Sequence, residues 1–258
     1  MNRKNKMIAS FTVICTLIII FLLYYLSFYV PLKITQAYYD AKECLDKNEK
    51  VMVVLLDGFS YDEYIEAKNK NKIPFLENFY KGKALSVYKP VTNAGFAAII
   101  TGQPPIKNGV FDRSFRELKT ESIFAYAQRK NKKSILLEAD IKILNTEIEP
   151  HLHLDENKNG NIDDEIFNDA MEASISDYDL IFIHFHGIDD RGHSFGPNSE
   201  ETLNYINKID SYIKNINAVW GNTIILTADH GMHEEGVGGS HGKFIKEDMN
   251  VPYFKVIP

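Results

Sequence analysis

Three apolar runs in this chain each end at an aspartate, and this pattern constrains the fold more than any other feature. VMVVLLD ends at Asp57, IFIHFHGID ends at Asp189, and TIILTAD ends at Asp229. Short continuous apolar runs are typical of parallel strands that are buried on both faces of a sheet. Because ligands of open α/β sheets bind at the carboxyl ends of the strands, we expect the three carboxylates to meet at one edge.

Helical patterns separate these runs. Leu203, Ile206, Ile209, Ile213 and Ile216 form an apolar stripe at helical spacing, and the stretch from Thr92 to Thr101 is followed by Gly102 and Pro104, which end helices. Strands that alternate with helices predict an α/β fold, namely a doubly wound, mostly parallel sheet with helices on both faces. We expect helices over 61–82, 92–101, 115–130, 163–176 and 199–217, and further strands over 84–90, 134–140 and at the C-terminal VPYFKVIP.

Histidines accompany the three aspartates. His193 follows Asp189 by four residues, His230 is adjacent to Asp229, and His241 lies in a glycine-rich segment eleven residues after His230. An isolated Asp or His in a loop is usually a surface or capping group, but this set of oxygen and nitrogen donors suits zinc, and manganese or iron less strictly. The candidate metal ligands are Asp57, Asp189, His193, Asp229, His230 and His241.

Thr92 stands after a predicted strand, at the start of a predicted helix. The N-terminus of a helix favours phosphate, and a metal-coordinated hydroxyl there can act as a nucleophile. The alternative is an ordinary N-cap residue, which is the commonest role of Thr at such a place. The local sequence leaves both interpretations open.

The motifs resemble those of the alkaline phosphatase superfamily, in particular its type I phosphodiesterase/nucleotide pyrophosphatase branch. TGQPP begins at Thr101, nine residues after Thr92, and DDRGHSFGP extends from Asp189 to Pro197. DHGM begins at Asp229, and GSHG contains His241. The short separation between the last two motifs is similar to that of the glycosylphosphatidylinositol ethanolamine-phosphate transferases.

The resemblance implies two divalent metal ions, zinc or manganese, and catalysis by Thr92 through a phosphothreonine intermediate. One ion would be held by Asp189, His193 and His241. The other would be held by Asp57, Asp229, His230 and the Thr92 oxygen. The branch usually has Asn three residues after the nucleophile, where this chain has Gly95, so Asn93 becomes the candidate contact to the substrate phosphate.

Two smaller features are open to alternatives. Asp155, Asn157, Asn159 and Asp163 have the spacing of a calcium loop, although Ile166 stands at its twelfth position, and a polar turn before an acidic helix start is the alternative. His184 and His186 alternate on one strand and point to the same face, where we expect packing, although His186 could reach the site.

The N-terminus indicates a membrane anchor. Arg3, Lys4 and Lys6 precede an uncharged stretch over 7–32, which is long enough to cross a bilayer, and the basic flank predicts a cytoplasmic N-terminus. We expect residues 1–6 in the cytoplasm, a single-pass anchor over 7–32, a stalk over 33–50, and an extracytoplasmic metal-dependent domain over 51–258 at the cell membrane. A cleaved signal peptide, with a weak cleavage site at Ala37, is the alternative.

Charge and cysteine content exclude some classes of protein. The formal net charge of -6 does not favour a nucleic-acid-binding surface. Cys15 and Cys44 predict neither a disulfide framework nor a catalytic thiol. The predicted function is a phosphodiesterase or phosphatase acting on an extracytoplasmic phosphoester, one that could be linked to lipid or the cell envelope. The alternatives are a phosphoethanolamine-type head-group transferase and a non-catalytic metal-binding module.

Overall fold

The computed structural model describes residues 12–21 and 32–258, and the chain divides into two compact units, Met1–Pro31 and Leu32–Pro258. Residues 12–21 of the predicted anchor are helical, and its last residue, Leu32, belongs to the second unit. The remaining residues of the predicted anchor, 7–11 and 22–31, lie outside the described residues. Within the described ranges, no helix combines the length and apolar character needed to span a bilayer.

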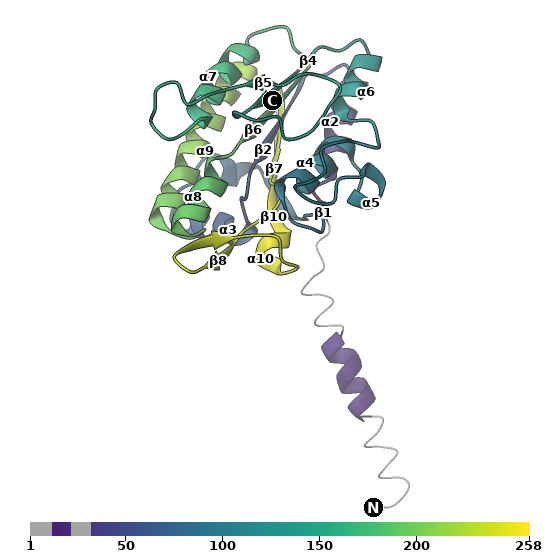
Figure 1. The fold of residues 1–258 in the computed structure, drawn as a ribbon, viewed down its shortest axis with the longest axis vertical. Helices are drawn as coiled ribbons and strands as arrows, with labels where there is room; N and C mark the ends of the chain where they lie inside the picture. The colour runs from purple at the N-terminus through teal and green to yellow at the C-terminus, as the bar shows by residue number, and fades with distance from the viewer. Residues whose placement is uncertain (1–11, 22–31) are drawn as a thin grey trace, which may run out of the picture. The chain divides into compact units, whose positions relative to one another are not determined.

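An eight-stranded sheet forms the centre of the second unit, with the strand order β1-β3-β10-β7-β2-β6-β4-β5 (Figure 1). Only β10 runs antiparallel to its neighbours among these described strands. The strands are β1 (Leu32–Lys33), β2 (Val51–Leu56), β3 (Tyr80–Leu85), β4 (Ser134–Glu138), β5 (His151–Leu152), β6 (Leu180–Phe185), β7 (Thr223–Thr227) and β10 (Asn250–Val256). A separate hairpin consists of β8 (His233–Glu235) and β9 (Gly238–Ser240).

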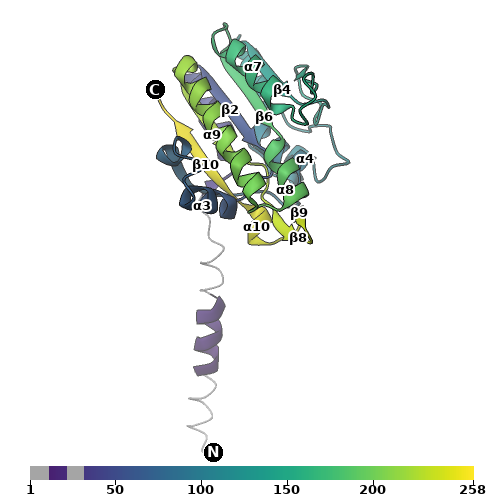
Figure 2. The same cartoon turned by 90° about the vertical axis from the view of Figure 1, so that its left-hand side faces the viewer.

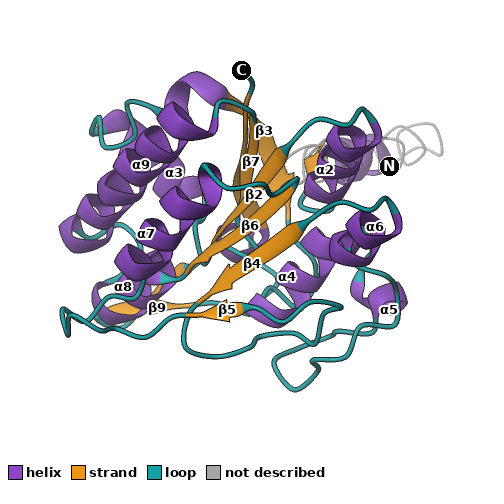
Figure 3. Cartoon of the chain, turned by 90° about the horizontal axis from the view of Figure 1, so that it is seen from above, coloured by secondary structure: helices purple, strands orange, loops and turns teal. Residues whose placement is uncertain are grey.

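Helices cover both faces of the sheet, as the sequence predicts (Figure 3). On one face lie α3 (Tyr61–Asn69), α7 (Asp163–Ser174), α8 (Gly187–Phe195) and α9 (Glu200–Trp220). On the other lie α2 (Gln36–Asp46), α4 (Thr92–Thr101), α5 (Pro105–Asn108) and α6 (Ile123–Arg129). The 3-10 helix η1 (Leu76–Phe79) and the short α10 (Lys246–Met249) complete the described elements. The long α9 and its neighbours run alongside the strands (Figure 2).

The core strands follow from their composition. Every residue of β2, VMVVLL, and of β6, LIFIHF, is buried, which is the pattern of strands covered on both faces. The apolar stripe of α9 is buried as expected, and the Ser199 hydroxyl caps this helix by accepting a hydrogen bond from the Thr202 amide at 3.1 Å.

The predicted stalk over 33–50 is wrong, because these residues belong to the folded unit. Lys33 ends β1, and α2 packs on the sheet through Ala37, Ala41, Cys44 and Leu45, all buried. Their helical spacing places small and apolar side chains on one face, although the composition of the segment is polar. The folded unit therefore begins at Leu32.

Other differences concern where elements begin and end. The predicted helix over 61–82 is divided, since α3 ends at Asn69 and β3 begins at Tyr80. The predicted helix over 115–130 is confined to α6, which begins after the N-cap Ser122. The strand expected to reach Asp189 ends at Phe185, so Asp189 lies in the first turn of α8.

Candidate active site

The candidate ligands come from the carboxyl ends of adjacent strands. Asp57 follows β2 directly, and Asp229 and His230 follow β7, which pairs with β2 in parallel. Asp189 and His193 occupy successive turns of α8, the helix after β6, so both side chains lie on one face of it. The structure thus brings together residues that the sequence separates by more than a hundred positions.

The first group consists of Asp57, Asp229 and His230, all buried. The Nε2 atom of His230 lies 3.3 Å from Oδ1 of Asp57 and 3.5 Å from Oδ2 of Asp229. Thr92 adjoins this group, with its hydroxyl oxygen 3.4 Å from the same Nε2 atom. These are the three residues that the resemblance assigns to one metal ion, together with the proposed nucleophile.

The second group consists of Asp189, His193 and His241. Nε2 of His193 lies 3.3 Å from Oδ2 of Asp189, and Nε2 of His241 lies 3.8 Å from Oδ1 of the same carboxylate. These residues are the set that the resemblance assigns to the other ion.

All three imidazoles are oriented in the same way by the backbone. The Nδ1 atoms of His193, His230 and His241 lie 2.8, 3.0 and 3.0 Å from the carbonyl oxygens of Gly239, Gly231 and Pro90. A carbonyl oxygen only accepts, so each Nδ1 donates its hydrogen and Nε2 is the ring nitrogen turned toward the carboxylates. Histidine ligands of metals are usually held through their second nitrogen in this way.

The buried carboxylates also fit a metal. Oδ1 of Asp57, Oδ1 of Asp189 and Oδ2 of Asp229 are buried and have no hydrogen-bond partner among residues 12–21 and 32–258. Such atoms are costly to bury unless they are paired with charge or coordinate a cation. Ligand atoms bound tetrahedrally to one ion at about 2.1 Å are about 3.4 Å apart, close to the nitrogen-to-oxygen separations in both groups.

The pKa values of the two acids beside His230, Asp57 and Asp229, are shifted in opposite directions. Burial favours the protonated form of Asp57, but hydrogen bonds from His184 and His186 outweigh it and hold its pKa well below the ordinary value. Burial and then the charges of Asp57 and Asp189 raise the pKa of Asp229 well above its ordinary value. A cation between these groups would remove the repulsion that keeps a proton on Asp229.

The pKa values of the histidines of the second group also diverge. A hydrogen bond with Asp189 raises the pKa of His193 to about 9, whereas burial and the nearby His230 lower the pKa of His241 to about 4. His241 is therefore neutral at physiological pH and able to bind a cation through Nε2.

Thr92 is not a capping residue. The N-cap of α4 is Val91, which has an extended backbone, and no side chain caps this helix. The Thr92 hydroxyl faces His230 instead. Its place in the first turn of a buried ten-residue helix leaves backbone amides nearby for an anion.

Asn93, the candidate phosphate contact, is buried and bonded within the domain. Its Nδ2 donates to the carbonyl oxygens of Phe115 at 3.1 Å and Ile143 at 3.2 Å, which ties α4 to two loops. The surroundings of Gly95 leave no room for the Asn that is usual at this position in the branch. A Cβ atom there would lie 2.4 Å from the carbonyl oxygen of Asp229, so no side chain fits.

The candidate calcium loop has other bonding. The carboxylate of Asp155 accepts hydrogen bonds from the amides of Asn159 and Gly160 at 3.0 and 2.8 Å. Asp163 is buried and accepts from the amides of His186 and Gly187, both at 2.9 Å, so it caps the start of α8. Calcium binding by Asp155, Asn157, Asn159 and Asp163 stays a prediction. Asp163 would then have to bind the ion and also cap α8.

Arg113 is a residue that no sequence motif indicates. Its guanidinium lies 2.7 Å from Nε2 of His241, and with Lys89 it lines a pocket of about 500 Å³ beside the second group. Ser114, His193 and Ser240 also line this pocket. Two cations at the mouth of the site suit an anionic substrate. Only the fold shows this, because Arg113 lies in a loop far from the ligand motifs.

The fold is similar to that of alkaline-phosphatase-like enzymes. The profile of the family described as type I phosphodiesterase / nucleotide pyrophosphatase matches residues 51–143 and 141–247. The chain belongs to this family.

Solved structures agree on the fold. Murine ectonucleotide pyrophosphatase / phosphodiesterase 5 aligns with a TM-score of 0.55 and 20% identity, covering 73% of this chain and 58% of that one. Phosphonoacetate hydrolase from Sinorhizobium meliloti 1021 aligns with a TM-score of 0.54 and 18% identity, covering 71% and 56%.

Curated relatives match over a short region. The catalytic subunit of human GPI ethanolamine phosphate transferase 2 is 33% identical over 85 residues, which is 30% of this chain and 8% of the relative. Human GPI ethanolamine phosphate transferase 1 is 36% identical over 84 residues, 29% of this chain and 9% of the relative. The matched region thus spans less than a tenth of these relatives.

Proposed function

We propose that this protein is a phosphoric ester hydrolase that uses Thr92 as its nucleophile and two divalent metal ions, zinc or manganese. One observation carries the proposal. Three imidazoles are fixed through Nδ1, with Nε2 near the carboxylates of Asp57, Asp189 and Asp229, and the Thr92 hydroxyl adjoins Nε2 of His230. Asp189, His193 and His241 would hold one ion, and Asp57, Asp229, His230 and Thr92 the other.

The chemistry follows from these positions. The Thr92 oxygen forms a bond to phosphorus while the bond to the leaving-group oxygen breaks, and the phosphoryl group passes next to water. When bound, the two cations lower the pKa of the hydroxyl and neutralise charge on the phosphate. Arg113 and Lys89 attract the anionic substrate to the pocket.

The test combines metal content with turnover. The purified full-length chain, loaded with zinc or manganese, should hold about two ions and cleave p-nitrophenyl phosphate or bis-p-nitrophenyl phosphate. Chelation should abolish turnover, and readdition of metal should restore it. A metal-free chain with full activity would contradict the proposal. A chain that holds two ions but cleaves neither ester in the presence of acceptor alcohols would favour a non-catalytic binding module.

A head-group transferase is the second candidate, favoured by the similarity to the GPI ethanolamine phosphate transferases. Here the phosphoryl group on Thr92 would pass to an alcohol of a lipid or glycan. Adding an acceptor alcohol to a turnover assay separates the two functions. A transferase forms a new phosphodiester and releases little free phosphoester, whereas a hydrolase releases the product to water.

We also propose that the apolar stretch from residue 7 up to the start of the folded unit at Leu32 anchors the chain in the cell membrane, with the enzyme outside the cytoplasm. The basic residues Arg3, Lys4 and Lys6 before the apolar run support this orientation. Protease added to spheroplasts should digest the domain and spare the N-terminus. If the domain were digested only after lysis, it would lie in the cytoplasm, and the proposed orientation would be wrong.

A further inference from the structure

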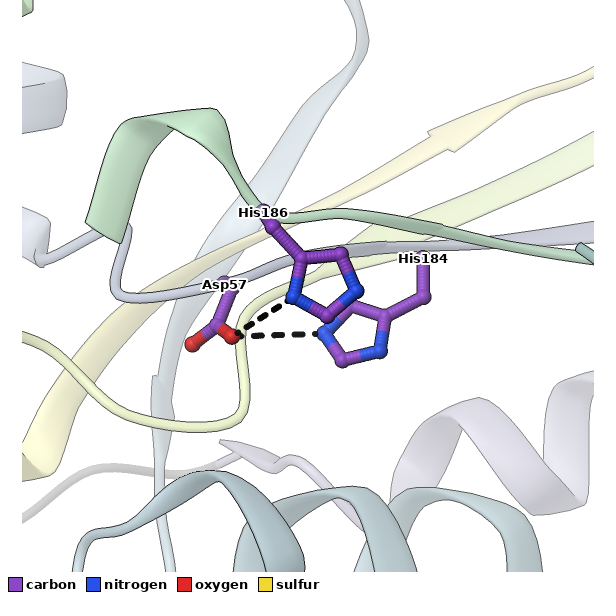
Figure 4. A group of neighbouring side chains, drawn as sticks. All are labelled: Asp57, His184 and His186. Atoms are coloured by element: carbon purple, nitrogen blue, oxygen red, sulfur yellow. Dashed lines mark ion pairs between the residues drawn. The ribbon is translucent and has the colours of Figure 1, made fainter. Parts of the chain in front are cut away.

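A second cluster of ionisable side chains lies behind Asp57 (Figure 4). Oδ2 of Asp57 lies 3.4 Å from Nε2 of His184 and 3.5 Å from Nδ1 of His186. The other nitrogens of these rings face Glu138, with Nδ1 of His184 at 3.2 Å from Oε1 and Nε2 of His186 at 3.4 Å from Oε2. Two imidazoles thus span the space between two carboxylates.

The cluster joins three neighbouring strands. Glu138 ends β4, His184 lies in β6 with His186 just after it, and Asp57 follows β2. Glu138 and His184 are 1% and 0% exposed, so these charges are almost fully removed from water. Burying such groups is costly, and packing alone would favour apolar side chains here.

The two oxygens of Asp57 have different surroundings. Oδ1 lies 3.3 Å from Nε2 of His230, on the side of Thr92. Oδ2 faces both rings of the cluster. The rings therefore fix the rotation of this carboxylate and direct Oδ1 toward the proposed ion.

The two rings of the cluster lie close together. The centroids of His184 and His186 are 3.8 Å apart and their planes are tilted by 33°. Figure 4 shows one nitrogen of each ring pointing to the same Asp57 oxygen, side by side. The ligand atoms of Asp57, His184 and His186 are also close enough to hold an ion, so a test of the cluster must count the bound ions.

We propose that Glu138, His184 and His186 are positioning residues that orient Asp57 as a metal ligand. This inference rests on the proposed function, because it requires that Asp57 binds an ion. Groups that hold a ligand in this way usually contribute 10- to 100-fold to metal affinity, so about that loss is expected on disrupting the cluster. The effect should be confined to the ion at Asp57, Asp229 and His230.

The experiment measures the affinity of both sites separately. The metal-free full-length chain is titrated with zinc by calorimetry, for wild type, Glu138→Gln and His186→Gln, and melting temperatures are recorded. The two cluster variants should lose about 10- to 100-fold in affinity at one site and keep the other site unchanged. His186 is partly exposed, so its variant tests the proposal even if Glu138→Gln fails to fold.

Glu63→Gln is the matched control. Glu63 is also a fully buried glutamate, but its carboxylate accepts from the Ser60 amide in the capping box of α3. This variant should keep both zinc affinities.

The outcomes separate the inference from the proposed function. Folded cluster variants with two wild-type affinities would overturn the positioning role while leaving the two-metal site standing. A third zinc ion bound by wild type and lost in Glu138→Gln would also overturn it, since the cluster would then be a metal site. A wild-type chain that binds no zinc or manganese would refute the proposed function itself.

Discussion

Gly95 and Asp229 touch at the point where the first turn of α4 meets the end of β7. A Cβ atom on Gly95 would lie 2.4 Å from the carbonyl oxygen and 2.5 Å from the Cβ of Asp229. The helix that carries Thr92 can approach Asp229 only because position 95 has no side chain. The absence of a side chain at Gly95 thus lets the proposed nucleophile, Thr92, lie close to the proposed metal ligand, Asp229.

Replacing Gly95 with Ala should therefore damage the site. The helix must move, and a shift of about 1 Å of a reacting group can cost about 100-fold in rate. Overpacking should also lower the free energy of unfolding by about 1–3 kcal/mol. Steady-state kinetics and urea denaturation measure the two effects. A wild-type kcat in Gly95→Ala would show that this close approach is not needed.

Thr92→Ala should abolish turnover while leaving the fold and most of the bound metal in place. The side chain caps no helix, so its loss removes the hydroxyl and little else. Thr92→Ser keeps a hydroxyl at the same atom and should retain part of the activity. Turnover and metal content by elemental analysis are the measurements. Wild-type rates in Thr92→Ala would exclude this residue as the nucleophile.

Arg113→Ala should raise KM by about 10-fold or more, because a charge-assisted bond to a phosphate is worth about 1.5–3 kcal/mol. Arg113→Lys should recover only part of this, since an ammonium lacks the planar fork of a guanidinium. Arg116→Ala is the control, because Arg116 bonds to the carbonyl of Lys142 and does not line the pocket. Equal KM values for Arg113→Ala and Arg116→Ala would contradict substrate binding by Arg113.

Glu63 should make the stability of the protein depend on pH. Burial raises its pKa from 4.5 to about 8, so between these values the folded chain keeps a proton that the unfolded chain has released. Stability therefore falls as pH rises through this window, by at most about 1.4 kcal/mol per pH unit. Glu63→Gln removes the titration, so relative to wild type it should gain stability from about pH 5 to pH 8. Urea denaturation at both ends of the range measures this, and parallel pH profiles would refute it.

Much of the site could be predicted because strand direction alone gathers its ligands. Asp57 and Asp229 end adjacent parallel strands, so their convergence required only the α/β pattern. The sequence predicts Asp189 at a strand end, but it is the third residue of α8, and the first turn of this helix still places it at the same edge. The family motifs supplied the grouping of the ligands.

Contacts made by loops and across strands could not be predicted in this way. Glu138 looks like an ordinary strand-end acid, and only the order of β4 beside β6 shows that it faces His184. Arg113 reaches His241 across a separation of 128 residues with no periodic pattern to indicate it. The polar composition of 33–50 predicts a stalk, because it does not reveal the buried face of small residues on α2.

The carbonyl oxygens that hold His193, His230 and His241 have a consequence for how the protein acquires its ions. The hydrogen bonds at Nδ1 orient the three rings before any ion binds, and the carbonyl groups that accept them belong to the folded backbone. We therefore expect metal to bind to a site that is already folded. Zinc fingers differ, because they fold only when they bind metal. Under the proposed function, the chain would lose its ions to a competing chelator, remain folded, and regain activity when metal is supplied again.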